Sequence, residues 1–132
     1  MSTMQAQAGA AVKVARFVKL GAANHRLINA AAATDLIVGI SQEGSYDSPL
    51  PANTNTDKCA LAAGDQFEYF PWGSEALLIA GVGGLTRGVP ATSDADGLGV
   101  DAAATNYVGF LPFETVIAGE KCRGLVTSPY KL

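Results

Sequence analysis

The chain has 132 residues, a formal net charge of −3, 48% hydrophobic residues and only 16% charged residues. That size suits one domain and that composition excludes intrinsic disorder, although much of the hydrophobic share is alanine. No apolar run reaches the roughly 18 residues of a membrane-spanning helix, and the first 20 residues lack a signal-peptide pattern. We therefore expect a soluble protein made in the cytosol.

The charges are distributed unevenly along the chain. Residues 1–30 contain four basic residues and no acidic one, whereas the remaining residues contain five bases and twelve acids. An acidic body argues against nucleic-acid binding, which needs a basic face. The basic leading segment, with Lys13, Arg16 and Lys19, favours docking onto another protein. Alternatively, these are solvated charges that flank one strand.

The first two predicted elements are an arm and a strand. Residues 1–11, "MSTMQAQAGAA", are small and polar without periodicity, which predicts an extended, exposed N-terminal arm. From Val12 the chain alternates, with Val12, Val14, Arg16 and Val18 on one side of a strand that reaches Lys19. Residues 12–132 then form a single domain, and removal of the arm is expected to leave its fold intact.

A buried strand and a long loop follow. "DLIVGI", residues 35–40, is typical of a buried strand, and the alanine run before it is too short and poorly capped for a convincing helix. Residues 45–58, "SYDSPLPANTNTDK", contain two prolines and no apolar rhythm, which predicts a long surface loop.

The segment "QFEYFPW", residues 66–72, concentrates the aromatic side chains. Phe67 and Tyr69 alternate toward one face of a strand that ends at Pro71, and Phe70 and Trp72 can project toward the other face. Two aromatic faces indicate that one packs the core while the other contacts a partner. The alternative is a large core with a partly exposed Trp72.

The rest of the chain predicts short strands separated by glycine turns. "ALLIAGVGGLTRGVP", residues 76–90, suggests a strand followed by a bulge or corner, and two more strands are joined across "AGE". "ATDLIVGI" followed by "LAAGDQFEY" is weakly echoed by "ATNYVGF" followed by "VIAGEKCRGLV". This predicts two similar strand–turn–strand units in one sheet system, within a mainly β barrel or sandwich domain.

"SDADGLGVD", residues 93–101, could be a calcium loop or a turn. Counted as an EF-hand loop from Asp94, Asp96 and Gly99 fit, but position 5 is Leu98 and position 12 is Thr105. Asp-Gly is a strong hairpin signal, because a type I′ turn needs positive φ at both central residues. We therefore predict a hairpin turn at Asp96–Gly97 and no metal site.

Catalytic and cofactor motifs are incomplete. "GVGGLTRG", residues 81–88, lacks the Gly-Lys-Ser/Thr end of a phosphate loop and opens no helix. His25 is the only histidine, and no serine lies in a nucleophile elbow. Cys59 and Cys122 are too few for a disulfide framework and are expected to be reduced, in or near the core. The sequence predicts no enzyme, catalytic residue or cofactor.

The order of these features resembles that of the small capsid decoration, or cement, proteins of tailed bacteriophages. The resemblance covers roughly residues 12–127 and rests on a run of short segments: "ARFVKL", "ATDLIVGIS", "AAGDQFEY", "GGLTRGVP", the Asp-Gly turn, "YVGF" and "IAGEKCRGLV". The long loop at 45–58 and "FEYFPWGSE" depart from the simplest members of the family.

The resemblance implies a β-barrel or tulip-like domain on the exterior of the virion. Such a protein binds the phage major capsid protein, commonly as a homotrimer, and stabilises the expanded head lattice. In these families the N-terminal arm, here residues 1–19, often lies along the coat protein or a neighbouring copy. Together with the charge and aromatic patterns, this gives six expected partner-interface residues: Lys13, Arg16, Lys19, Tyr69, Phe70 and Trp72.

Two other functions stay open at this stage. One is a carbohydrate- or host-surface-binding β module, in which Tyr46, Tyr69 and Trp72 would stack on sugar rings. The other is a minor structural protein of the tail or of the head–tail joint.

Overall fold

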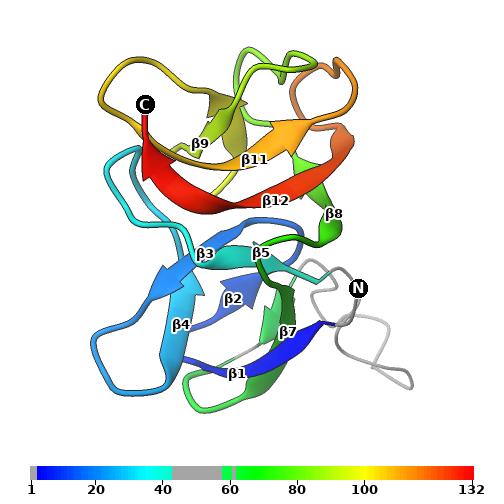
Figure 1. Cartoon of the computed structure of the whole chain (residues 1–132). Helices are drawn as coiled ribbons and strands as arrows, with labels where there is room; N and C mark the ends of the chain where they lie inside the picture. Colours follow the sequence, from blue (N-terminus) through cyan, green and yellow to red (C-terminus); the bar gives the residue numbers. More distant parts are fainter. Residues whose placement is uncertain (1–2, 43–57, 61) are drawn as a thin grey trace.

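The computed structural model describes residues 3–42, 58–60 and 62–132, and for residues 58–60 the backbone alone. All regular structure in these ranges is β, arranged as two stacked units (Figure 1). The prediction of a mainly β protein with a small barrel is confirmed. No helix in the described part of the chain is long and apolar enough to cross a membrane. The loop predicted at 45–58 falls, up to residue 57, outside the described residues, as does the side chain of Cys59.

The lower unit in Figure 1 is a closed barrel of five strands. In order around the barrel they are β1 (Met4–Ala8), β4 (Arg26–Asn29), β3 (Phe17–Leu20), β5 (Gly39–Ser41) and β7 (Gln66–Phe70). β1 closes the barrel by pairing antiparallel with β7 and parallel with β4. A short ladder of β2 (Val12–Lys13) and β6 (Lys58–Ala60) accompanies it. The barrel interior is filled by six buried side chains: Ala8, Val12, Val14, Val18, Leu27 and Phe67.

The upper unit is a five-stranded sheet. Its strands are β10 (Gly99–Asp101), β9 (Ala91–Ser93), β11 (Tyr107–Pro112), β12 (Lys121–Lys131) and β8 (Glu75–Ile79). They follow one another in the same order as the corresponding strands of the barrel, with β8 in the place of β1 and β10 in the place of β4. A single parallel bridge between Ala80 and Gly99 connects the end of β8 to β10. It occupies the place of the parallel β1–β4 pairing in the barrel. The upper sheet is therefore an incompletely closed version of the lower barrel.

Matching turns confirm that the two units are built alike. In the turn that precedes β7, the Asp65 carbonyl accepts the Ala8 N–H at 2.8 Å. In the turn that precedes β12, the Glu120 carbonyl accepts the Ala80 N–H at 2.9 Å. The carboxylates of Asp65 and Glu120 each accept the backbone N–H three residues earlier, at 2.9 and 3.1 Å. The sequence predicted two similar strand–turn–strand units within one sheet system. The repeated pattern instead marks corresponding strands of two separate sheets.

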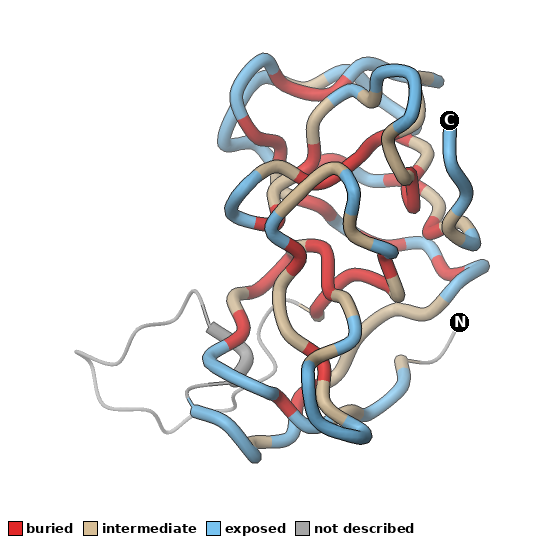
Figure 2. Tube along the Cα trace, turned by 90° about the vertical axis from the view of Figure 1, so that its left-hand side faces the viewer, coloured by how far each residue is buried: buried red, intermediate tan, exposed pale blue. Residues whose placement is uncertain are grey.

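One hydrophobic core joins the units. Phe17, Ile37 and Ile40 from the lower unit pack in one buried cluster with Leu78 and Phe110 of the upper sheet. Figure 2 shows buried segments in both units and at the waist between them. A shared core holds the two units together, because separating them would expose these side chains to water.

Residues 4–8, predicted as part of an exposed arm, form β1 instead. The pattern "MQAQA" gave no strand signal because only Ala8 of this strand is fully buried, while Met4, Gln5 and Gln7 face solvent. The strand is specified by its ladder partners, and such partners cannot be read from local propensity.

The single strand predicted from Val12 to Lys19 is in fact two. Ala15 has φ 53°, which turns the chain between β2 and β3 and ends the alternation. Its backbone explains the turn, since Ala15 N–H donates to the Ser41 carbonyl at 3.1 Å and its carbonyl accepts Ile79 N–H at 3.0 Å. As a consequence, Val14 and Ala15 are both buried.

The turn predicted at Asp96–Gly97 joins β9 and β10, but its geometry is not type I′. Within the turn Gly97 has positive φ, at 78°, and Asp96 does not. Gly97 N–H donates to the Asp94 carbonyl at 3.3 Å, and Asp94 N–H donates to the Leu98 carbonyl at 3.0 Å. A type I turn followed by a glycine bulge fits these bonds. The Asp94 carboxylate accepts the N–H groups of Asp96 and Leu98, at 2.8 and 3.0 Å.

Because β1 closes the barrel, removal of residues 1–8 should destabilise the protein. We expect the free energy of unfolding to fall by about 4 kcal/mol, from several ladder bonds worth about 1 kcal/mol each. Urea denaturation followed by tryptophan fluorescence measures this change, and removal of residues 1–2 is the matched control. Equal stability of both truncated chains would contradict a structural role for β1.

Candidate functional site

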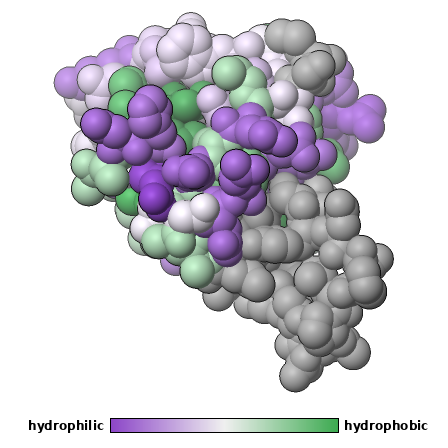
Figure 3. Space-filling model, turned by 90° about the horizontal axis from the view of Figure 1, so that it is seen from below, coloured by the Kyte–Doolittle hydropathy of each residue, from purple (hydrophilic) through white to green (hydrophobic). Residues whose placement is uncertain are grey.

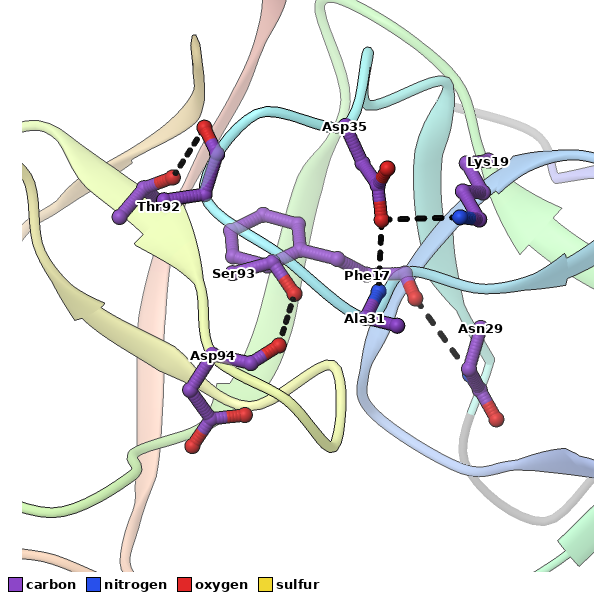
Figure 4. Close-up of polar contacts among 9 residues, drawn as sticks. Phe17, Lys19, Asn29, Ala31, Asp35, Thr92, Ser93 and Asp94 are labelled. Carbon is purple, nitrogen blue, oxygen red and sulfur yellow. Dashed lines mark hydrogen bonds and ion pairs between the residues drawn. The ribbon is translucent and has the colours of Figure 1, made fainter. Parts of the chain in front are cut away.

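The three basic residues of the predicted interface are partly used inside the fold. Lys13 is half-buried, and its backbone N–H donates to Asn29 Oδ1 at 2.8 Å. Lys19 forms an ion pair with Asp35, with 3.0 Å between Nζ and Oδ2 (Figure 4). The Nε of Arg16 is buried without a hydrogen-bond partner among the described residues. Lys19 and Arg16 therefore have different surroundings, and contact of the three basic residues with a partner stays a prediction.

Asp35 ties the segment before β5 to β3. Its Oδ2 accepts the Ala31 N–H at 2.8 Å in addition to the ion pair with Lys19. Burial raises the pKa of Asp35, but the hydrogen bonds from Ala31, Lys19 and Ala32 and the charge of Lys19 outweigh it. The net pKa lies below its ordinary value of 3.8. Figure 4 shows this carboxylate beside the chain that carries Phe17 into the core.

The aromatic residues separate into two grooves. Tyr69 and Trp72 line one groove of about 270 Å³ with Met4, Val38 and Pro71, which we call the aromatic groove. Phe70 lines a different groove at the start of β8. The predicted pairing of Phe70 with Trp72 on one face is therefore wrong. Pro71 ends β7, so Trp72 no longer follows the alternation of the strand.

The prediction that Phe67 and Tyr69 share one face of the strand is confirmed. Phe67 is buried in the barrel interior, and Tyr69 is partly buried against the same cluster. Their ring centroids lie 6.5 Å apart. Tyr69 therefore anchors the floor of the aromatic groove on the barrel core.

Exposed apolar side chains surround the aromatic groove. Met4 and Trp72 are each 51% exposed, and Leu20 is 67% exposed. Tyr69 and Val38 also line an adjoining groove with Leu20, to which Gln5, His25 and Arg26 contribute polar groups. Seen from below (Figure 3), hydrophilic residues cover much of the described barrel surface, with hydrophobic patches between them. Rimmed apolar surface of this kind is typical of protein contacts.

Sequence reasoning missed Met4 and Val38 in this groove. Met4 was assigned to the arm, and the place of Val38 depends on the pairing of β5 with β7. The signal available was the register of β1, in which Met4 lies opposite Tyr69. Only a correct strand assignment for residues 4–8 could have revealed it.

The groups that could carry chemistry are dispersed. His25 is exposed in the turn between β3 and β4 with φ 63°. Asp101 accepts the N–H and hydroxyl of Thr86, at 3.0 and 2.8 Å. Cys122 is a free, buried thiol, and burial raises its pKa. No group of three or more His, Cys, Asp or Glu side chains that could hold a metal occurs among the described residues.

The fold defines a class of mainly β protein with a closed barrel and a second five-stranded sheet, and solved structures share it. The chain is similar to the N base of the head fibre protein gp8.5 of bacteriophage phi29, with a TM-score of 0.62 and 17% sequence identity. The match covers 99% of this chain and 97% of that one. No protein-family model matches the chain, and no curated protein has a matching sequence. At this identity the likeness shows a common fold.

Replacement of Asp35 by asparagine should remove a pH-dependent contribution to stability. Because the folded-state pKa of Asp35 is lowered, its stabilisation is fully present above pH 3.8 and is lost as the pH falls through the folded-state pKa. We expect Asp35→Asn to lower the free energy of unfolding by about 1 kcal/mol at neutral pH. The difference should shrink in acid, and urea denaturation at several pH values measures it. A difference that is constant with pH would contradict the assignment.

Proposed function

We propose that this chain is a structural protein of a phage head, which binds the outer surface of the capsid and stabilises the expanded lattice. The observation that carries this proposal is the match, over nearly the whole of both chains, to a protein of a phage head fibre. The decoration-protein resemblance of the sequence also supports a structural protein of a phage head. The expected partner is the major capsid protein, bound by a homotrimer of this chain.

The surface supports a binding role. The aromatic groove presents Trp72, Tyr69 and Met4 to solvent over a rigid barrel wall. Burial of such large apolar side chains at a contact gives affinity. A protein that binds the assembled lattice and not free coat subunits stabilises the lattice by mass action. Many identical contacts then add through multivalency.

The first test is the protein composition of purified virus particles from the source phage. A lattice-wide decoration role predicts a copy number close to that of the major capsid protein. A few copies per particle would place the chain at a vertex, a tail or a head–tail joint instead. Absence from the particle would refute a virion function altogether.

Replacement of Trp72 by alanine tests the aromatic groove. Because Trp72 is 51% exposed, the variant should keep its stability. It should bind expanded heads that lack this protein about tenfold more weakly, a loss of about 1.4 kcal/mol. Occupancy is measured by sedimentation of heads with titrated protein. Val82→Ala is the matched control, since Val82 is 90% exposed in the upper unit, away from this groove. Equal losses for both variants would argue against a specific role of the groove.

The exposed ring of Trp72 beside Tyr69 also favours a second candidate, a carbohydrate-binding module. Sugar rings stack on such faces, and the two functions separate in one comparison. Binding to a glycan array that is abolished by Trp72→Ala would support the sugar-binding function. Absence of glycan binding together with saturable binding to heads would support the capsid function.

A further inference from the structure

One edge of the upper sheet is open. β8 pairs with β12 on one side, and among the described strands none pairs with its other side along residues 75–77. The corresponding strand of the barrel, β1, has partners on both sides, β7 and β4. In the upper unit the single bridge at Ala80 replaces the second partner. An open strand edge presents backbone donors and acceptors to a further strand.

The register identifies the backbone groups at this open edge. Alternate residues of an antiparallel strand bond to the same neighbour. Ala80 N–H donates toward β12, to Glu120, whereas Ile79 N–H points the other way and donates to Ala15. By the same alternation, the N–H and carbonyl groups of Leu77 and Glu75 point away from β12.

These groups open onto a groove between the two units. The groove has a volume of about 300 Å³ and is lined by Gln42, Phe70, Glu75, Ala76, Leu77 and Arg123. The apolar walls of the groove are formed by Phe70 from the barrel and Leu77 from the upper sheet. Leu77 is 37% exposed. Glu75 and Arg123 form an exposed ion pair there, with 3.3 Å between Arg123 Nε and Glu75 Oε1. The groove thus combines apolar walls, charges of both signs and an unpaired strand edge.

We propose that an extended segment of the phage coat protein occupies this groove and pairs with β8 as an additional strand. The inference rests on the proposed function and deepens it by naming the contact. An extended polypeptide is the occupant that fits, because only a second backbone offers N–H and carbonyl groups at the spacing of Glu75 and Leu77. One apolar side chain of that segment packs between Phe70 and Leu77. The Glu75–Arg123 ion pair favours polar residues in the docked segment on either side of that apolar side chain.

Hydrogen exchange of the unmodified chain tests the contact directly. The amide of Leu77 is compared in the free protein and in protein bound to expanded heads that lack this protein. Strand addition should slow exchange of the Leu77 amide at least tenfold. The amide of Leu78, which faces β12, is the internal reference and should change less. Unchanged exchange at Leu77 on occupied heads would overturn this inference and leave the capsid function standing. Failure of the unmodified protein to bind heads would overturn both.

A pair of variants separates the backbone contact from the side chain. Leu77→Pro removes the N–H that faces the groove, and the edge position tolerates proline. Leu77→Ala truncates the side chain but keeps the N–H, so it is the matched control. We expect the proline variant to bind heads at least tenfold more weakly than the alanine variant. Equal binding of the two would overturn the proposal.

Self-association distinguishes a coat segment from a second copy of this chain. Sedimentation equilibrium of Leu77→Pro and Leu77→Ala compares their oligomeric states in solution. A coat-protein strand predicts the same oligomeric state for both. Dissociation of the proline variant alone would assign the edge to contacts between copies and overturn the coat-protein assignment.

Discussion

The corner between β2 and β3 holds the two units together through backbone hydrogen bonds. At Ala15 the chain adopts positive φ, so the N–H of this residue bonds to β5 while its carbonyl bonds to β8. Two residues later, Phe17 N–H donates to the Gly97 carbonyl in the upper unit at 2.9 Å. The backbone of three consecutive residues therefore contacts the barrel and the upper sheet at the same time.

The buried hydroxyl of Ser41 completes this corner. It donates to the Lys13 carbonyl at 2.6 Å and accepts the Arg16 N–H at 3.1 Å. Ser41 is fully buried, so loss of these bonds would leave several polar groups without water or protein partners. A rigid corner fixes the distance between β5 and β8, and that distance sets the width of the groove between the units.

The sequence predicted the β class and the turns better than it predicted the strand partners. Local chemistry suffices for turns such as 62–65 and 117–120, where a glycine with positive φ precedes a carboxylate that bonds back to the chain. The split at Ala15 was missed because alanine rarely adopts positive φ and nothing in "VKVARFV" marks the turn. The bonds that compensate for it come from Ser41 and Ile79, which are distant in sequence. The aromatic groove was half-predicted for the same reason, since Met4 reaches it only through the β1–β7 register.

The first strands of the two units differ in the polarity of their residues. β1 reads "MQAQA" and β8 reads "EALLI", yet they hold equivalent places in their sheets. The polar strand is enclosed by β7 and β4, whereas the apolar strand carries the open edge. Soluble proteins normally protect an open edge with charges, and within β8 itself Glu75 is the one charged residue. An open edge that retains Leu77 at its centre is costly for an isolated protein in water. The cost is offset where a second chain covers the edge, as the proposed pairing of an extended segment with β8 requires.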